Sequence, residues 1–228
     1  MVTPADFLQA ASTEQYKKIY ELEQPLVTIC IPTYNRADAL LNCSLKSAVR
    51  QTYTNLEIIV VGDGCTDHTA DVIRQFNDPR IKFENRESRG EYPSETYQRW
   101  LVAGSIPTNR ALELATGHFI THLDDDDEFF DDRIEKLVAF AKETQADLIY
   151  HPFYYLIGPE QWVMNDAEPL MCAKVTTSSM FYHNWLKCIP WDPRSYLLNE
   201  PGDWNKVRRM VELGIKTARY PEPLTMKH

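Results

Sequence analysis

The chain alternates short apolar runs with amphipathic segments between Pro25 and about His151. Residues 26–31 and 56–61 are almost continuously apolar, which predicts strands buried on both faces of a parallel sheet. Further short runs predict three more strands, at 81–84, 118–123 and 147–151. Apolar positions at helical spacing predict helices at 37–50, 66–76, 109–115, 131–145 and 203–213. This alternation predicts a doubly wound α/β domain with ligands at the carboxyl ends of its strands.

Two segments fall outside this alternation. Residues 3–23 carry a partial apolar stripe after Thr3-Pro4, which predicts an N-terminal helix. We expect this helix to pack outside the main domain or against a partner, where it could support a homodimer. Residues 87–107 mix glycine and proline with aromatic residues and predict a long excursion with some helix. Excursions of this length in compact domains commonly form lids or binding loops.

Composition narrows the class of protein. With 43% hydrophobic and 25% charged residues, the 228-residue chain has the composition of an ordinary globular protein. Its net charge of −9 argues against a nucleic-acid partner, because phosphate binding needs a basic face. The chain has five cysteines and no CxxC pair, so we expect reduced thiols in a cytoplasmic protein. The sequence shows neither a signal-peptide pattern nor an apolar run of the ~18 residues needed to cross a bilayer, and we expect no transmembrane segment.

The strongest chemical signal is the run of five carboxylates from Asp124 to Glu128, directly after a predicted strand. These side chains repel one another, and a divalent cation with a preference for oxygen ligands, Mg²⁺ or Mn²⁺, would relieve the repulsion. The alternative is a solvated acidic turn that stabilises the N-terminus of the next helix through Asp131 or Asp132. An EF-hand is excluded because Phe129 stands where its loop needs glycine.

A second signal is the turn Gly62-Asp63-Gly64 after the predicted strand 56–61. Small residues let a ligand approach the backbone, and the Asp63 carboxylate can accept from a base N–H or a ribose hydroxyl. The alternative is an ordinary tight turn before a capped helix. A dinucleotide-binding fingerprint would need a third glycine at Asp67, which disfavours an NAD-dependent dehydrogenase.

Taken together, these segments resemble the family 2 glycosyltransferases of the GT-A fold. The resemblance covers about residues 25–145 and rests on five motifs in the family's order: Pro32-Thr33-Tyr34-Asn35-Arg36, Ser47-Ala48-Val49-Arg50-Gln51-Thr52-Tyr53, Leu56 to Asp67, Asn109 to Gly117, and Leu123 to Phe129. It implies a GT-A-type, Rossmann-like mixed sheet, mainly parallel. It also implies an inverting, metal-dependent glycosyltransferase that moves a sugar from a nucleoside diphosphate, by default UDP, to an acceptor hydroxyl.

The resemblance also implies roles for single residues. The nucleotide would be wrapped by the loop after the first strand, and the base would be read by the aspartate of the second turn: Pro32, Thr33, Tyr34, Arg36 and Asp63. Within the Asp-x-Asp motif, Asp124 would lie near the ribose and Asp126 on the Mn²⁺ or Mg²⁺ ion. The donor sugar would be contacted by Asp127, which could instead support the metal, and by Asn109. Near the C-terminus, Asp203 would be the general base, and His228 would lie on the metal or the diphosphate.

Three positions depart from the family's pattern. Gly62 replaces the first of two usual aspartates, and Gly202 stands where glutamate is usual. Thr108 replaces an arginine, which removes one phosphate-binding side chain and leaves three candidates to compensate for it: Arg86, Arg89 and Arg110. For Asp203 itself, the alternative to catalysis is a first-turn acid on the helix that follows.

We therefore expect one compact domain in three parts: an N-terminal helical extension (1–24), a nucleotide-sugar-binding half (25–151) and an acceptor-side half with the base (152–228). The acceptor could be a saccharide, a lipid-linked sugar or a protein, and a lipid-linked acceptor would need peripheral association with the membrane. Two other classes stay open. One is a metal-dependent nucleotidyltransferase or sugar-nucleotide hydrolase. The other is a catalytically silent sugar-nucleotide-binding module, which the changes at Gly62 and Gly202 would allow.

Overall fold

A seven-stranded, mainly parallel sheet forms the centre of the protein. The computed structural model describes residues 2–228, and the sheet has the strand order β10-β6-β9-β4-β1-β2-β3. Its strands are β1 (Val27–Thr33), β2 (Leu56–Gly62), β3 (Ile81–Asn85), β4 (Phe119–His122), β6 (Leu148–Tyr150), β9 (Met180–His183) and β10 (Thr217–Arg219). Only β9 runs antiparallel to its neighbours, β4 and β6. The predicted mainly parallel α/β sheet is confirmed.

The two central strands are buried along their whole length. Every residue of β1 and β2 is buried, as their continuous apolar runs predict. The strands pair in parallel with Val27 opposite Leu56 and Thr33 opposite Gly62, and β4 pairs in parallel on the other side of β1. The carboxyl ends of β1, β2 and β4 therefore meet at one edge of the sheet, which brings the three predicted motif loops together.

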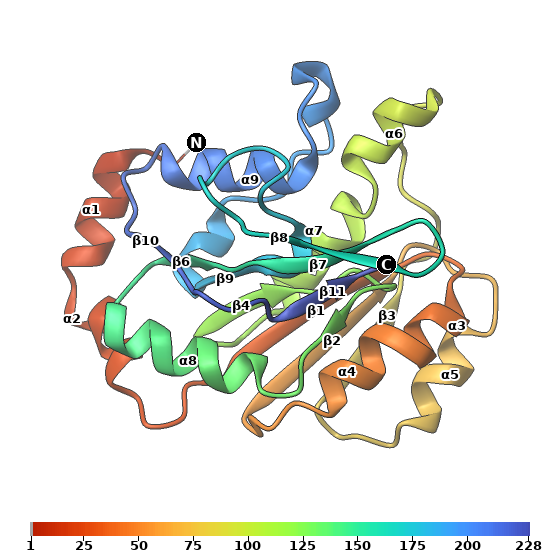
Figure 1. Cartoon of the computed structure of the whole chain (residues 1–228), viewed down its shortest axis with the longest axis horizontal. Coiled ribbons are helices and arrows are strands. Elements are labelled where there is room, and N and C mark those ends of the chain that lie inside the picture. Colours follow the sequence, from red (N-terminus) through yellow and green to blue (C-terminus); the bar gives the residue numbers. More distant parts are fainter. Residues whose placement is uncertain (1) are drawn as a thin grey trace.

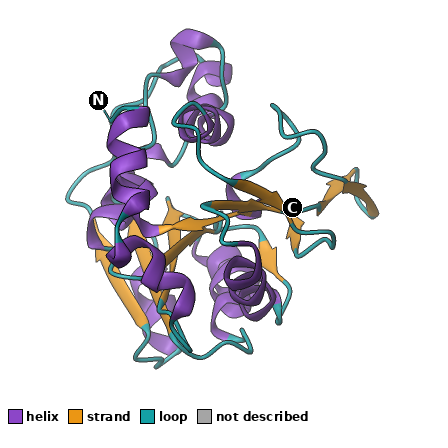
Figure 2. Cartoon of the chain, turned by 90° about the vertical axis from the view of Figure 1, so that its left-hand side faces the viewer, coloured by secondary structure: helices purple, strands orange, loops and turns teal. Residues whose placement is uncertain are grey.

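Helices cover both faces of the sheet (Figures 1 and 2). The helical segments after β1 and β2 are α3 (Ala37–Ala39), η2 (Leu40–Ser44), α4 (Leu45–Val49) and α5 (Thr69–Gln75). The other long helices are α6 (Thr96–Val102), α7 (Ser105–Leu114), α8 (Arg133–Thr144) and α9 (Gly202–Val211). Short 3₁₀ turns follow or precede β9 and α9: η3 (Thr177–Ser179), η4 (Asn184–Cys188) and η5 (Ser195–Leu198). No helix among residues 2–228 is long and apolar enough to span a bilayer.

A second, four-stranded sheet brings the C-terminus to the acidic run. Its order is β5-β11-β7-β8, with β5 (Glu128–Phe129), β7 (Phe153–Ile157), β8 (Gln161–Asn165) and β11 (Thr225–Lys227). β11 pairs antiparallel with β5, so that Met226 lies opposite Glu128. Lys227 and His228, the last two residues, therefore lie beside the carboxylates of residues 124–128.

The N-terminal segment differs from the single helix predicted at 3–23. It is broken into α1 (Pro4–Ser12), α2 (Glu14–Lys17) and η1 (Lys18–Glu21). Its aromatic side chains belong to the core, with Phe7, Tyr16 and Tyr20 each at most 6% exposed. The Tyr16 hydroxyl donates to Asp147 Oδ1 at 2.6 Å, and the Tyr16 ring stacks on His183 at 3.7 Å between centroids. The expectation that this segment packs outside the domain is wrong, because its aromatic side chains pack on Phe119 of β4, His183 of β9 and Trp185 after β9.

The excursion at 87–107 contains more helix than predicted. It holds α6 and the first turn of α7, which starts at Ser105 rather than at Asn109. Pro107 fits this first turn because the N–H groups there have no partner within the helix, so the missing N–H of proline costs nothing. Gly104, with φ of 74°, provides the left-handed backbone between the two helices.

Candidate active site

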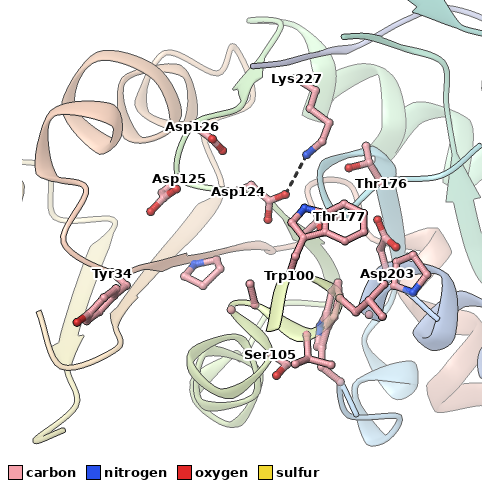
Figure 3. A pocket seen from close by; sticks show the side chains of 18 of the residues that line it. Tyr34, Trp100, Ser105, Asp124, Asp125, Asp126, Thr176, Thr177, Asp203 and Lys227 are labelled. Atoms are coloured by element: carbon pink, nitrogen blue, oxygen red, sulfur yellow. Dashed lines mark hydrogen bonds and ion pairs between the residues drawn. The ribbon is translucent and has the colours of Figure 1, made fainter. Parts of the chain in front are cut away.

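One large cavity lies over the carboxyl ends of the central strands. Its volume is about 910 Å³, the size of a site for a nucleotide or a drug-sized ligand. Most of the residues predicted for the site line it: Pro32, Thr33, Tyr34, Arg36, Asp63, Asp124, Asp126, Asp203 and His228. In Figure 3 the acidic turn and Tyr34 lie on one side of this cavity, and Asp203 lies on the other.

The cavity wall next to the loops after β1 and β2 combines an aromatic ring with a cation. Arg89 lies over the ring of Tyr34, with its guanidinium carbon 4.0 Å from the ring centroid. Arg89 forms no ion pair within residues 2–228, so its charge is available to an anion. Of the three arginines that could take over the role of the arginine absent at position 108, only Arg89 lines the cavity. Arg86 pairs with Asp63 and Arg110 with Glu84 and Glu113, so both are already engaged.

Asp63 is buried at the bottom of this wall. Its carboxylate accepts hydrogen bonds from Arg86, from the Gly90 N–H at 2.9 Å and from the Tyr92 hydroxyl at 2.8 Å. A carboxylate has about four lone-pair positions, so one acceptor position is left for a ligand. The excursion thus supplies two of the donors that orient Asp63, a role that its sequence alone did not reveal.

The glycine at 62 is explained by its neighbour. A Cβ on Gly62 would collide with the side-chain oxygen of Asn85. This oxygen accepts the Cys65 N–H at 2.8 Å, and the Asn85 amide donates to the Cys65 carbonyl at 2.9 Å. Asn85 therefore fills the space of a side chain at 62 and braces the turn that carries Asp63.

Arg36 bridges the two middle aspartates of the acidic turn. Its guanidinium nitrogens lie 2.8 Å from Asp126 Oδ2 and 3.3 Å from Asp125 Oδ1. Asp125 also accepts a hydrogen bond from the Thr33 hydroxyl at 2.8 Å, and burial raises the pKa of Asp125 to about 6. Asp125, which sequence analysis did not select, thus ties the loop after β1 to the acidic turn. The Asp126 side chain is more exposed, at 26%.

Lys227 lies between the other two aspartates. Its ammonium is 3.4 Å from Asp124 Oδ2 and 3.6 Å from Asp127 Oδ2, and Figure 3 shows the contact with Asp124 across the cavity. Burial raises the pKa values of both carboxyls above their usual range. Burial alone would lower the pKa of Lys227, but the two carboxylates raise it above its usual value. Sequence reasoning missed Lys227 because the pairing of β11 with β5, which places it here, leaves no local pattern.

The donor set of this turn fits a divalent cation. The carboxylates of Asp124 and Asp126 are hard oxygen ligands that face the cavity. The carboxylates of Asp124 to Asp127 carry four negative charges when ionised, against one positive charge each from Arg36 and Lys227. Asp127 Oδ1 is buried and has no hydrogen-bond partner among residues 2–228. The excess charge and the unsatisfied oxygen both match a cation-binding turn better than a solvated one.

Asp203 lies in the first turn of α9, across the cavity from the acidic turn. Burial raises its pKa to about 6, although the Trp204 N–H donates to its Oδ1 at 2.6 Å. Gly202 leaves room for the Trp191 side chain, because a Cβ at position 202 would lie 3.2 Å from the Trp191 ring. Trp191 is 5% exposed, and its indole N–H has no partner among the described residues. A carboxylate in such surroundings can take a proton near neutral pH.

Two predicted donor-sugar residues do not line the cavity. The Asn109 side chain donates to the Trp191 carbonyl at 2.9 Å and accepts from the Trp191 N–H at 2.8 Å. The structure therefore makes Asn109 a positioning residue for Trp191. Asp127 is fully buried below the cavity, where its Oδ2 accepts from the Ser178 hydroxyl at 2.7 Å.

His228 lies at the rim of the cavity, beside the acidic turn. Its Nε2 is 3.4 Å from Glu128 Oε1, and its ring packs edge-on against Trp162. Together with Cys43, His228 and Glu128 bring one potential ligand atom each within 4.8 Å of one another. The structure thus places His228 next to Glu128, the residue that follows Asp127 in the chain.

A mainly parallel α/β sheet with an Asp-x-Asp turn after β4, and a cavity over its strand ends, defines a GT-A-type glycosyltransferase domain. The sequence profile described as "Glycosyl transferase family 2" matches residues 28–94 and 103–189. The chain belongs to this family, as the ordered motifs predict.

Relatives and solved structures agree with this assignment. The chain is 31% identical over 169 residues to an Escherichia coli protein, the UDP-Glc:alpha-D-GlcNAc-diphosphoundecaprenol beta-1,3-glucosyltransferase WfgD, covering 74% of this chain and 60% of that protein. Staphylococcus aureus TarS 1-349 in complex with UDP superposes with a TM-score of 0.68 at 17% identity, over 88% of this chain and 60% of that one. The mannosyltransferase PcManGT from Pyrobaculum calidifontis, in complex with GDP-Man and Mn²⁺, gives 0.66 at 17% identity, over 90% and 57%.

The chain is shorter than the curated proteins it matches. Its match spans 32% of the length of the uncharacterized Escherichia coli glycosyltransferase YibD and 17% of the Streptococcus pneumoniae glycosyltransferase GlyA. What those whole proteins act on therefore bears on this chain only as a proposal.

Proposed function

We propose that this protein transfers a sugar from a nucleoside diphosphate to an acceptor hydroxyl, with inversion at the anomeric carbon. The observation that carries the proposal is the cavity itself, which has the acidic turn of Asp124 and Asp126 on one side and the half-buried side chain of Asp203 on the other (Figure 3). In this scheme residues 25–151 bind the donor, and residues 152–228 provide the base and the acceptor side.

The donor nucleotide is proposed to lie between the loops after β1 and β2. Tyr34 and Arg89 offer a ring face and a cation, and Asp63 keeps an acceptor position for a base N–H. We take UDP as the first candidate because TarS binds UDP in its solved complex. GDP is the second candidate, because PcManGT binds GDP-Man with Mn²⁺.

A divalent cation is proposed to be held by Asp126, with Asp124 beside it. Such an ion, when bound, offsets the negative charge that grows on the departing diphosphate. Arg89 faces the same cavity and adds positive charge to the site, while Arg36 orients Asp126. Charges that are in place before the reaction stabilise the transition state without a cost of reorganisation.

Asp203 is proposed to take the proton from the acceptor hydroxyl. As this proton leaves, the acceptor oxygen bonds to the anomeric carbon and the bond from that carbon to the diphosphate oxygen breaks. One displacement of this kind inverts the configuration. Positioned general bases contribute about 10²–10⁴-fold to the rate. The buried Trp191 beside Asp203 would exclude water and shape the acceptor side.

Calorimetric titration with UDP, GDP, CDP and dTDP, each with and without Mn²⁺, tests the donor proposal. We expect one nucleotide to bind in a metal-dependent manner, and Asp126→Ala to lose this dependence. Asp131→Ala is the matched control, since the Asp131 side chain is 57% exposed and pairs with Arg50 outside the cavity. If none of the four nucleotides binds, the nucleotide-sugar proposal fails. This result would favour the alternative that the protein is a catalytically silent module.

A transferase is separated from a hydrolase by its products. With the nucleotide sugar alone, a hydrolase would release free sugar as fast as transfer proceeds with an acceptor present. We expect free-sugar release to stay well below transfer. Equal rates would instead assign the protein to the sugar-nucleotide hydrolases.

We further propose that the acceptor is lipid-linked and that the protein associates peripherally with a membrane. Four large apolar side chains are exposed on two adjoining elements, α6 and η5: Tyr97 at 52%, Trp100 at 64%, Leu197 at 69% and Leu198 at 61%. Both elements project from the same side of the molecule (Figure 1). Trp100 also lines the cavity. The lipid part of an acceptor bound on this surface would therefore lie next to its sugar in the cavity. WfgD, by its name, acts on a sugar linked to diphosphoundecaprenol.

A further inference from the structure

Lys227 holds its ammonium between two carboxylates of the acidic turn, at the wall of the open cavity. Its ammonium lies 3.4 Å from Asp124 and 3.6 Å from Asp127, whose side chain is 0% exposed. The residue arrives from the far end of the chain, through the pairing of β11 with β5. The Thr225 hydroxyl, two residues earlier, donates to the Ser178 carbonyl at 3.0 Å, and the Ser178 hydroxyl donates to Asp127. The backbone that carries Lys227 is thus tied to the carboxylate that Lys227 contacts.

Two cationic side chains, Arg36 and Lys227, each pair with two of the four aspartates. Arg36 contacts Asp125 and Asp126, and Lys227 contacts Asp124 and Asp127. Both aspartates of the Asp-x-Asp motif therefore have a positive partner before any ligand binds. A dication beside Asp124 and Asp126 would lie close to the Lys227 ammonium, and two positive charges a few ångströms apart in a partly buried site repel strongly.

The Lys227 side chain is able to move away from the two carboxylates. Its side chain is 37% exposed and lines the open cavity, and the four-carbon stem of lysine reorients without movement of the backbone. Asp127, by contrast, is buried and cannot follow it. A displaced ammonium would therefore point into the cavity, where the diphosphate of a donor is proposed to lie.

We propose that Lys227 is the exchangeable counter-cation of this site. Its ammonium pairs with Asp124 and Asp127 in the ligand-free protein, gives way when a divalent cation binds, and then contacts the diphosphate of the donor. The last step rests on the proposed function, whereas the first two concern only the cation and the chain. Lys227 thereby sets the affinity of the site for the metal.

Titration of Mn²⁺ alone, followed by calorimetry, tests the exchange. Lys227→Met keeps the apolar stem and removes the charge, and it should bind Mn²⁺ at least about tenfold more tightly than the unmodified protein. Lys227→Arg should keep the original affinity. Lys136→Met is the matched control, because Lys136 also pairs with two carboxylates, Asp132 at 2.9 Å and Glu222 at 2.8 Å, outside the cavity. Unchanged or weaker Mn²⁺ binding by a folded Lys227→Met variant overturns the proposal.

A second measurement uses the unmodified chain and does not depend on a variant that folds. Acetylation of lysines by a small reagent, followed by mass spectrometry, should be slow at Lys227 and become severalfold faster when Mn²⁺ is added, while Lys136 stays unchanged. A rate at Lys227 that Mn²⁺ leaves unchanged or lowers contradicts the exchange. Addition of the nucleotide that binds should then slow the reaction at Lys227 again. Failure of nucleotide binding in a separate titration would count against the proposed function, while the Mn²⁺ result would still decide the exchange.

Discussion

The candidate site depends on single carboxylates whose surroundings differ. Asp203 is half-buried in the first turn of α9 and forms no ion pair among residues 2–228, whereas Asp126 is paired with Arg36. Burial disfavours the charged form of a carboxylate, so the two residues are suited to different tasks. The Asp203 carboxyl, with its pKa raised to about 6, gains and loses a proton near neutral pH, which suits a general base.

The pH dependence of transfer tests the role of Asp203. Its pKa is raised to about 6, and only the deprotonated carboxylate can accept a proton. We expect the transfer rate to be constant above about pH 7 and to fall roughly tenfold per pH unit below about pH 6. Asp203→Asn should lower kcat by about 10²–10⁴-fold and leave nucleotide binding intact.

Glu212→Gln serves as the control for this prediction. Glu212 follows α9, and its side chain is 59% exposed in an ion pair with Arg208. This variant should keep both the rate and the pH profile. Full turnover by Asp203→Asn would remove Asp203 from the mechanism.

At the scale of elements, the N-terminal helices are part of the domain and not an appendage. The hydroxyls of Tyr16 and Tyr20 both donate to Asp147 Oδ1, at 2.6 and 3.2 Å, directly before β6. Asp147 Oδ2 accepts the Lys216 N–H at 2.7 Å, directly before β10. One buried carboxylate therefore joins the N-terminal segment to the two strands at the edge of the sheet.

Removing one hydroxyl measures this connection. Tyr16→Phe should lower the free energy of unfolding by about 1.5–3 kcal/mol, because it removes a buried hydrogen bond to a charged group. Tyr97→Phe, at a tyrosine that is 52% exposed, should change it by less than about 0.5 kcal/mol. Urea unfolding monitored by circular dichroism gives both values. Equal stability of the two variants would mean that the hydrogen bond from Tyr16 to Asp147 does not stabilise the fold.

The exposed surface of α6 and η5 is tested with lipid vesicles. Flotation with vesicles of phosphatidylglycerol and phosphatidylethanolamine should recover the unmodified protein with the lipid. The double variant Trp100→Ser, Leu197→Ser should lose at least about tenfold in partitioning, because each buried large apolar side chain contributes about 1.5–3 kcal/mol. Met164→Ser, a 50% exposed residue of β8, is the control. Dimerisation without flotation would assign this surface to a second copy of the chain.

At the scale of the whole molecule, the pH dependence of stability is a balance between buried acids and buried histidines. The carboxyls of Asp125 and Asp203 have pKa values raised by burial to about 6, so the folded chain binds more protons there, and stability falls as pH rises through this range. Burial lowers the pKa values of three core histidines: His122, His151 and His183. The unfolded chain binds more protons on these side chains below about pH 6.5, so their contribution falls as pH falls.

His183→Gln isolates one of these contributions. Burial lowers the His183 pKa to about 4, and glutamine can keep a donor and an acceptor but does not titrate. Between pH 7.5 and 5.5 the unmodified chain should lose about 1 kcal/mol more of unfolding free energy than the variant. An equal pH dependence of the unmodified chain and His183→Gln would show that His183 is not buried neutral.

The sheet and the strand-end loops could be predicted because their signals are local. A run such as Leu56 to Val61 is almost continuously apolar, and this pattern favours a central parallel strand. Helix limits were less predictable. The start of α7 at Ser105 depends on Gly104 and on the tolerance of a first turn for Pro107, and the segment after β1 contains the π-helical turn η2. Such limits depend on caps and packing that periodicity does not record.

By itself the sequence determined the alternation of strands and helices between residues 25 and 151, the acidic turn after β4, the turn of Asp63 and the family. These features are set by residues close together in the chain, whose side chains share one strand, one turn or one helix. Only the tertiary structure decided that Lys227 lies on Asp124 and Asp127, that Asn109 holds Trp191, and that Tyr16 and Tyr20 join the core through Asp147. Each of these contacts joins residues far apart in the chain. Their formation depends on which strands pair and which faces pack, and a local pattern of apolar and polar residues does not specify that choice.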